Sequence, residues 1–344
     1  KERFYNYYII NLLMLKGKKV LITGGTGSLG QALTKKLLKT DVKAIRIFSR
    51  NESKQVEMES KLNDQRLRFL IGDIRDKERL VTAFEDIDII FHAAALKHVP
   101  VIEYNPFEAI KTNVVGSQNV IDASLIQNVE RAICIGTDKA VAPLNTYGAT
   151  KLLMEKLFVS ANNFPDHQKH RTIFLAVRYG NVVGSSGSVI PKFIEQMKLG
   201  NKVTITDPEM TRFSITMEQA LDFILECTVN GKASEIYIPK LKAYNIMDVK
   251  KAISEMIEDL GEKIVGIRPG EKLHEVLINR EEMRYSWDIG NKYMISNPLR
   301  DEKSIIESYQ NISKIQNSGE YSSDNTDRMT VKEIKETIHN SGLL

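Results

Sequence analysis

The chain has 344 residues, of which 42% are hydrophobic and 27% charged, and its formal net charge is +4. This length suits two domains of unequal size, and the composition is that of a globular protein with a sizeable core. The basic residues are scattered, which argues against nucleic-acid binding. No apolar run has the length of a bilayer span. The two cysteines lack metal-ligand spacing, so we expect no zinc site and a reducing cytoplasm.

Residues 1–13 precede the first regular pattern. They combine a charged start with a short apolar run and no small-residue cleavage site, so we interpret them as an N-terminal extension. From about Met14 to residue 184, β-branched runs alternate with amphipathic helical patterns. Strands are expected at 19–23, 44–48, 66–71, 87–92, 131–135 and 172–178, and helices at 29–38, 52–62, 77–84, 107–128 and 147–162. This alternation predicts an α/β protein with a Rossmann-type, doubly wound parallel sheet.

Beyond residue 184 the pattern becomes less regular. Short strands are expected at 202–206, 235–238 and 263–267, and helices at 189–199, 217–229, 246–260 and 331–338. We therefore expect a smaller C-terminal α/β lobe over 185–344 that binds the substrate, whereas 14–184 binds the cofactor. The stretch 317–327 is polar and rich in turn residues, as expected for part of a tail.

The first expected strand leads directly into a glycine-rich turn at residues 23–30, Thr-Gly-Gly-Thr-Gly-Ser-Leu-Gly. The turn contains the spacing G-x-G-x-x-G at Gly25, Gly27 and Gly30. Such glycines let the backbone approach a pyrophosphate, and the N-terminus of the next helix supplies N–H donors and a positive dipole. The motif predicts a dinucleotide cofactor, with a tight turn that binds no ligand as the alternative. The expected contacts are Gly24, Gly25, Thr26, Gly27, Ser28, Leu29 and Gly30.

The second strand ends without the carboxylate that, about 20 residues after the glycines, would bind a ribose hydroxyl and select NAD. It offers Ser49, Arg50 and Asn51 instead, with Lys54 one helical turn later. A guanidinium group matches a 2′-phosphate through paired hydrogen bonds. We therefore predict NADP as the cofactor, against the alternative of an exposed arginine without a ligand.

Two further strand ends contribute to the expected cofactor site. After the third strand, Asp73 is placed to accept a hydrogen bond from an adenine amino group, next to Ile74. After the fourth, Ala93 and Ala95 leave room for the cofactor to pass close to the backbone. His92, at the end of that strand, is expected to pack rather than to catalyse.

The segment 137–151 follows the fifth strand and opens a helix. Tyr147 and Lys151 are four residues apart, so they share a helix face. A neighbouring ammonium lowers the pKa of a tyrosine, so we predict that Tyr147 takes a proton from a substrate hydroxyl while hydride passes to the cofactor. Thr137 is expected to hydrogen-bond the same oxygen. Tyr147, Lys151 and Val182 are also expected to contact the cofactor.

Several longer segments resemble one family of extended short-chain dehydrogenases/reductases. They are His-Ala-Ala-Ala-Leu-Lys-His-Val-Pro at 92–100, Thr-Asp-Lys at 137–139, Arg-Tyr-Gly-Asn-Val at 178–182, Met-Thr-Arg-Phe at 210–213 and Arg-Pro-Gly-Glu-Lys-Leu-His-Glu at 268–275. The family is that of the inverting UDP-N-acetylglucosamine 4,6-dehydratases of flagellin glycosylation and capsule synthesis. The similarity covers roughly residues 14–327. Gly136 departs from the pattern, because those relatives usually have serine there, whereas Tyr147 is kept.

The resemblance implies a lyase that removes water from UDP-N-acetylglucosamine, inverts C5 and keeps NADP bound throughout. Asp138, if kept protonated, would give a proton to the departing C6 hydroxyl. Lys139 would remove the C5 proton, with its pKa lowered by Lys151, Lys97 and the positive ring of the cofactor. The predicted product is a UDP-2-acetamido-2,6-dideoxy-4-ketohexose.

The resemblance also implies substrate contacts from both parts of the chain. Lys97 would reach cofactor and substrate, and Asn181 would hydrogen-bond the nucleotide sugar. Arg212 and Arg268 would neutralise the pyrophosphate, and Glu271 would accept a hydrogen bond from a ribose hydroxyl.

Two other functions stay open at this point. A 4-epimerase of UDP-glucose or UDP-N-acetylglucosamine needs only the tyrosine, lysine and threonine, and a non-catalytic NADP-sensing regulator needs no reaction at all. We expect no metal, no nucleic-acid partner and no membrane span. A homo-oligomer, either a dimer or a hexamer, is expected by analogy with extended relatives.

Overall fold

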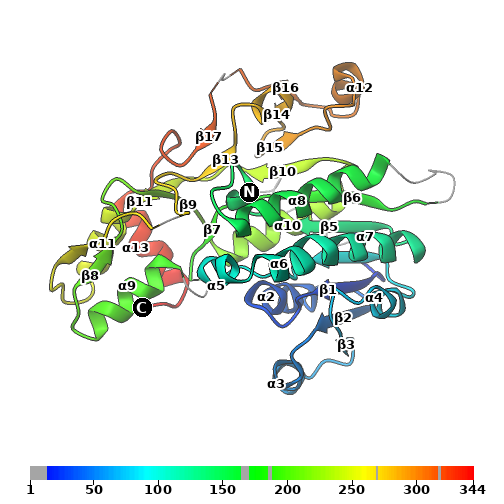
Figure 1. The fold of residues 1–344 in the computed structure, drawn as a ribbon, viewed down its shortest axis with the longest axis horizontal. Helices are drawn as coiled ribbons and strands as arrows, with labels where there is room; N and C mark the ends of the chain where they lie inside the picture. Colours follow the sequence, from blue (N-terminus) through cyan, green and yellow to red (C-terminus); the bar gives the residue numbers. More distant parts are fainter. Residues whose placement is uncertain (1–13, 164–169, 185–187, 269, 317–318) are drawn as a thin grey trace.

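The computed structural model describes residues 14–163, 170–184, 188–268, 270–316 and 319–344, and the expected N-terminal extension lies outside them. Within these residues, a ten-stranded sheet has the order β16-β14-β15-β10-β6-β5-β4-β1-β2-β3 (Figure 1). The strands from β3 to β10 run parallel to their neighbours. The order β3-β2-β1-β4-β5-β6 is that of a Rossmann-type doubly wound sheet, which confirms the expected fold class.

The six strands expected in the first half of the chain are present, each within two residues of its predicted bounds. The parallel strands are β1 (Lys19–Thr23), β2 (Ala44–Ser49), β3 (Leu67–Ile71), β4 (Ile89–His92), β5 (Arg131–Ile135), β6 (Ile173–Val177) and β10 (Ile236–Pro239). Three strands that were not expected extend the sheet antiparallel beyond β10. They are β15 (Lys292–Ile295), β14 (Ser286–Asp288) and β16 (Ser313–Lys314).

Helices cover both faces of this sheet, and alternate strand residues pack against opposite layers. Val20 and Ile22 belong to the same core as Leu33 of α2 and Ile224 of α10, whereas Leu21 belongs to the core on the other face. The first layer contains α2 (Ser28–Leu37), α3 (Glu52–Leu62) and α10 (Met217–Asn230). The second contains α4 (Lys77–Ala83), α7 (Gly116–Ile126) and α8 (Thr146–Ser160).

The helix expected over 107–128 is present over 106–126, but a π-helical stretch that was not expected divides it into three consecutive pieces. These are α6 (Pro106–Ala109), a π-helical stretch η1 (Ile110–Val115) and α7, and they follow the short helix α5 (Val99–Tyr104). The π-helical turn buries Asn113 completely and directs its amide to the loop after β4. Wider turns of this kind frequently occur at functional sites, and apolar periodicity does not reveal them.

A second lobe has its own core, formed by helices α9 (Val189–Lys198), α11 (Ile246–Ser254) and α13 (Val331–Asn340) and by short strands. Figure 1 shows these three helices together, to one side of the large sheet. The strand pairs are β8 (Val203–Ile205) with β12 (Glu262–Ile264), β9 (Thr211–Ile215) with β7 (Asn181–Val182) and β11 (Ala243–Asn245), and β13 (Val276–Ile278) with β17 (Tyr321–Ser322). The remaining helical segments are η2 (Asp138–Ala140), η3 (Ala161–Asn163), η4 (Glu282–Tyr285) and α12 (Glu302–Glu307).

The chain beyond residue 184 contributes to both parts of the molecule. Within it, α10 packs on α2, and β10 pairs in parallel with β6, so that residues 217–239 return to the large sheet. The expected helix over 246–260 ends at Ser254, and Leu260 beyond it is exposed, because no core lies next to that stretch. The division of cofactor and substrate binding at residue 184 stays a prediction. In the part of the chain that the structure describes, no helix is both long and apolar enough to cross a membrane.

Candidate active site

The glycine-rich turn lies between β1 and α2, beside the end of β4. Gly24 has a φ of +68°, and a Cβ added there would lie 2.8 Å from Cα of Ala94. A Cβ on Gly30 would lie 2.5 Å from the carbonyl oxygen of Gly25, so only glycine lets α2 start this close to the turn. The N-cap residue Gly27 provides no side-chain cap. The first amides of α2 are therefore free to bind an anion, and the turn fits the pyrophosphate of a dinucleotide.

The ends of β2 and β3 bring Arg50 and Asp73 together. The Arg50 side chain is 54% exposed, and its Nη1 lies 3.7 Å from Oδ2 of Asp73, which also accepts a hydrogen bond from Arg75. Two neighbouring candidates have structural partners. Oγ of Ser49 accepts a hydrogen bond from Gln55, and Asn51 caps α3 by accepting one from the amide of Lys54. Arg50 is therefore the side chain of this group that stands open to a ligand phosphate.

His92 packs beneath the glycine turn, as expected. Its Nδ1 lies 2.8 Å from Oγ1 of Thr23 and its Nε2 lies 2.9 Å from Oγ of Ser117. The ring stacks on Phe158. Burial, together with the charge of Lys151, lowers the pKa of His92 to about 3, so the ring stays neutral. Its role is to fix the end of β4 to β1 and α7.

Asn113 is a residue of this site that the sequence reasoning missed. Its Oδ1 accepts a hydrogen bond of 2.8 Å from the amide of Leu96, and its Nδ2 donates to the Leu96 carbonyl and to Oγ1 of Thr150. It thereby joins the loop of Ala93 and Ala95 to α8, next to Lys151. Ile74, which was expected beside the cofactor, has its side chain in the core between the sheet and α7.

Tyr147 and Lys151 lie on the first turns of α8, as expected. Asn145 caps this helix by accepting a hydrogen bond of 2.8 Å from the amide of Gly148. A side chain on Gly148 would overlap the carbonyl oxygen of Lys139, so the glycine lets α8 begin directly against η2. The helix thus brings the phenol of Tyr147 to Thr137, Asp138 and Lys139, all of which act on its pKa.

The expected effect of Lys151 on Tyr147 stays a prediction, because the strongest effects on the phenol in this structure come from other groups. The Lys151 ammonium donates a 2.8 Å hydrogen bond to the carbonyl of Ile135 and is buried, which lowers its pKa. Burial raises the pKa of Tyr147 to about 12, and the charges and hydrogen bonds that oppose this rise come from Lys139 and Thr137. The cation that favours the phenolate is therefore Lys139.

In η2, the buried Asp138 forms an ion pair with the half-buried Lys139. Nζ of Lys139 lies 3.0 Å from Oδ1 of Asp138, which also accepts a 2.8 Å hydrogen bond from Thr137. Burial raises the pKa of Asp138, which agrees with the expected protonated acid. The expected low pKa of Lys139 is wrong: burial would lower it, but Asp138 and Glu275 together raise the pKa of Lys139. Glu275 ends the motif at 268–275, but the sequence assigns it no role beside Lys139, because 136 residues separate the two along the chain.

Gly136 connects β5 to this pair in a confined space. A Cβ on Gly136 would lie 2.7 Å from the carbonyl oxygen of Val177 and 3.2 Å from Oε2 of Glu155. Its amide donates a 2.7 Å hydrogen bond to that same carbonyl. The absence of a side chain lets β5, β6 and α8 meet here, immediately before Thr137.

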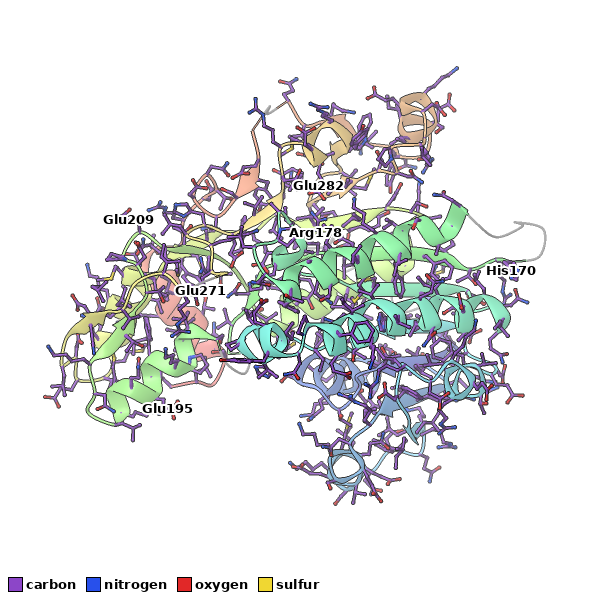
Figure 2. The ribbon with its side chains drawn as sticks, in the orientation of Figure 1. His170, Arg178, Glu195, Glu209, Glu271 and Glu282 are labelled. Carbon is purple, nitrogen blue, oxygen red and sulfur yellow. The ribbon has the colours of Figure 1, made fainter. Side chains whose placement is uncertain are left out.

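Arg178, at the end of β6, lies behind the site and is completely buried. Its guanidinium donates to Glu155 of α8 at 3.0 Å, to both oxygens of Glu282 at 2.9 Å and to the carbonyl of Leu277 at 2.8 Å. Figure 2 shows Arg178 and Glu282 next to each other. The arginine therefore fixes the catalytic helix to the segment that follows Glu275.

The predicted substrate residues of the second lobe take different positions. Arg212 on β9 is largely buried, and its guanidinium donates to the carbonyls of Thr211, Lys272 and Leu273. Arg268 is more exposed than Arg212, and its Nη1 lies 3.8 Å from Oε1 of Glu271. Figure 2 shows Glu271 between the helices of the second lobe and Arg178. Lys97 is exposed after β4. Asn181 is brought to the acid–base pair, with Oδ1 3.4 Å from Nζ of Lys139.

The sheet, the glycine turn and the Tyr-x-x-x-Lys helix define an extended short-chain dehydrogenase/reductase. Residues 20–297 match the family described as "Polysaccharide biosynthesis protein", and the chain belongs to that family.

Several known proteins resemble the chain over most of its length. The inverting UDP-N-acetylglucosamine 4,6-dehydratase of Campylobacter jejuni (strain 81-176) is 44% identical over 95% of this chain and 99% of its own. A UDP-glucose 4-epimerase of Rickettsia bellii is 41% identical over 95% of this chain and 97% of its own. An uncharacterized membrane protein of Methanocaldococcus jannaschii is 48% identical over 78% of this chain and 82% of its own.

Solved structures share the architecture. Pen from Bacillus thuringiensis is 38% identical and superposes with a TM-score of 0.88 over 96% of this chain and 99% of that one. The dTDP-glucose 4,6-dehydratase DesIV from Streptomyces venezuelae, solved with NAD bound, is 20% identical with a TM-score of 0.66 over 74% of this chain and 86% of that one. The latter likeness supports the fold.

Proposed function

We propose that the chain is a UDP-N-acetylglucosamine 4,6-dehydratase of the inverting type. The observation that carries the proposal is the pair of buried Asp138 and half-buried Lys139 beside the Tyr147 phenol. An enzyme that only oxidises and reduces C4 needs the tyrosine, whereas the removal of water also needs an acid for the C6 hydroxyl and a base for the C5 proton. The Campylobacter relative, at 44% identity, bears the name of this activity.

The first step uses Tyr147. Its phenol takes the proton of the C4 hydroxyl, and Lys139 and Thr137 stabilise the resulting charge. A bound nicotinamide dinucleotide supplies the hydride acceptor and later the hydride donor. The glycine turn, with no space for a Cβ at Gly24 or Gly30, fits the pyrophosphate of that group.

The second step uses the acid–base pair. A C4 ketone makes the C5 proton acidic, and Lys139 removes it in its amine form. Asp138 and Glu275 raise the pKa of Lys139, so in this proposal the positive ring of a bound cofactor, which would lower that pKa, makes the amine available. Asp138 in its acid form, which burial favours by raising the pKa of this carboxyl, protonates the C6 hydroxyl, and the hydroxyl departs as water. Return of hydride to C6 and of a proton to the opposite face of C5 gives a UDP-2-acetamido-2,6-dideoxy-4-ketohexose with inverted C5.

The nucleotide part of the substrate belongs to the second lobe in this proposal. Arg268, which is exposed, and Arg212 bind the pyrophosphate, and Glu271 binds the ribose. Asn181 and Lys97 approach the sugar from the large sheet. Arg212 donates to backbone carbonyls in this structure, so its contact with a phosphate requires it to release some of them.

Incubation with UDP-N-acetylglucosamine in deuterated water tests the proposal. Mass spectrometry should show the loss of one water, and proton NMR should show deuterium at C5 of the product. A 4-epimerase, the activity in the name of the Rickettsia relative, leaves the mass unchanged. A protein that binds NADP and transforms no UDP-sugar would instead be a regulator.

Within the nicotinamide cofactors we propose NADP, bound through Arg50 together with Ser49 and Lys54. Replacing Arg50 by glutamine should weaken NADP binding by about tenfold to a hundredfold, because a charge-assisted bond to a phosphate is lost, and should leave NAD binding nearly unchanged. Calorimetric titration of both cofactors measures the ratio. Arg68→Gln, which alters an exposed arginine on the adjacent strand β3, is the control. Equal losses for the two cofactors would show that Arg50 does not read the 2′-phosphate.

Three broader features complete the proposal. The two cysteines are free and buried, in keeping with a cytoplasmic enzyme. The family description supports a place in surface polysaccharide or glycoprotein synthesis. Exposed apolar side chains on neighbouring elements support a homo-oligomer, a dimer or a hexamer. They are Val101, Tyr104 and Phe107.

A further inference from the structure

Glu275 lies beside the acid–base pair, immediately before β13. Nζ of Lys139 is 3.0 Å from Oδ1 of Asp138, 3.3 Å from Oε1 of Glu275 and 3.4 Å from Oδ1 of Asn181. An ammonium group has three donors, and these three oxygens match that number. Lys139 is thus bound by Asp138 of η2, by Asn181 of β7 and by Glu275. The segment that follows Glu275 is fixed to α8 through Arg178.

The two carboxyl groups share a closely confined space. The side chains of Asp138 and Glu275 are 1% and 5% exposed. Oδ2 of Asp138 and Oε2 of Glu275 are buried and accept no hydrogen bond from the residues that the structure describes. Burying two ionised carboxylates that are not fully hydrogen-bonded is costly, so one of the pair carries a proton more readily than it would in water.

The neighbouring cations determine which carboxyl group keeps its charge. Nε of Arg212 lies 3.6 Å from Oε1 of Glu275, and Lys272 also acts on that carboxylate. Burial would raise the pKa of Glu275, but Lys139, Arg212 and Lys272 lower it. Burial raises the pKa of Asp138, and although Lys139 opposes this, the charge of Glu275 adds to the rise.

Two phenols complete the surroundings of this group. Tyr147 on α8 and Tyr244 on β11 both interact with Asp138 and Glu275. Burial raises the pKa of each phenol to about 12, so both are neutral here. The negative charge of the group therefore resides on Glu275.

We propose that Glu275 is a positioning residue for the dehydration: its carboxylate shares the Lys139 ammonium with Asp138 and leaves the proton of the two carboxyl groups on Asp138. In the elimination, the Asp138 O–H bond breaks, the C6 hydroxyl takes that proton, and the C6–O bond breaks with its electron pair leaving in water. Lys139 first releases one proton of its ammonium to solvent and then takes the C5 proton as an amine, while the C5–H electron pair forms the C5–C6 double bond. The inference rests on the proposed dehydratase function.

If Glu275 is charged, its removal should change the pH dependence of kcat. Activity needs one proton shared by Asp138 and Lys139, and a nearby negative charge raises both pKa values that bound this state. Glu275→Gln removes the charge and keeps the size, so both limbs of the kcat profile should move to lower pH by about one unit, with little change in KM.

Two variants separate charge from shape. Glu275→Asp keeps the charge, so its limbs should stay near those of the wild type even where kcat falls. Glu307→Gln alters an exposed carboxyl on α12, where it pairs with Lys303, and should leave kcat and both limbs unchanged. A lower kcat in Glu275→Gln with both limbs in place would show a merely structural role and overturn the inference.

A measurement without turnover separates this inference from the proposed function. In protein labelled with carbon-13 aspartate, infrared spectroscopy should show the carboxylic acid of Asp138 as a band that Asp138→Asn removes. In Glu275→Gln that band should disappear at a lower pH than in the wild type. If the wild type dehydrates no UDP-sugar but the band behaves in this way, the function fails and the charge sharing stands. A band that titrates alike in both proteins overturns the inference.

Discussion

Replacing Lys139 by methionine is expected to abolish the exchange of the C5 proton with solvent and to lower kcat for dehydration by about a hundredfold to ten-thousandfold. Methionine has a similar length, so the change removes the base and its charge while most of the packing is kept. The Tyr147 phenol also loses the cation that favours its ionisation. Deuterium incorporation by NMR and product formation by mass spectrometry measure the two effects separately.

Cofactor binding gives the control for this variant. Lys139 lies on η2, away from the glycine turn, so Lys139→Met should bind NADP with nearly unchanged affinity. Lys111→Met, at a partly exposed lysine that pairs with Glu108 on the surface, should keep full activity. Unimpaired deuterium exchange in Lys139→Met would remove this lysine from its proposed role.

Replacing Arg178 by methionine is expected to lower the free energy of unfolding by about 3–5 kcal/mol, because a buried ion pair then loses one partner. Glu155 and Glu282 would stay in the interior without the guanidinium that binds both of them. Urea denaturation followed by circular dichroism measures the loss. Arg284→Met, which breaks an exposed pair with Glu281, should change stability by less than about 1 kcal/mol.

The same variant should respond to pH in a characteristic way. Burial would raise the pKa of Glu282, but Arg178 lowers it below 4.5, the ordinary value of a glutamate. The wild type therefore gains stability from this group above that pH and loses it as the pH falls through the lowered pKa. Without Arg178 the buried carboxyl becomes easier to protonate, so the stability difference between the two proteins should narrow on acidification. A difference that is constant with pH would contradict this account.

The parallel part of the sheet is predictable because each strand is a short apolar run between helical patterns. Residues 19–23 and 131–135 are buried from both sides. Such strands have no solvent-exposed face, so their sequences read as nearly continuous apolar runs. The position of β10 next to β6 is not predictable in this way, because the neighbours of a strand depend on tertiary packing. The strands β14 and β15 escape prediction because each is only three or four residues long.

In the site, too, the sequence predicts which residues come together but not the charges that surround them. The spacing of Tyr147 and Lys151 and the triplet at 137–139 are sufficient to select the groups that we propose to react. Their charge states are not, since the prediction for Lys139 considered Lys97 and Lys151, whereas the charges that dominate in the structure are those of Asp138 and Glu275. Glu275 reaches the pair only through the pairing of the second lobe with the large sheet.

The confined space at Gly136 makes two positions interdependent. A serine introduced there alone would collide with the carbonyl of Val177 and with the carboxylate of Glu155, which is also a partner of Arg178. Transferring residues 136–139 from a relative with serine at 136 into this chain therefore requires a matched change at 155 together with a shift of the backbone at 177. Positions 136 and 155 should therefore change together in laboratory evolution of this enzyme. This interdependence at the end of β5 limits which sequences the loop that follows can adopt.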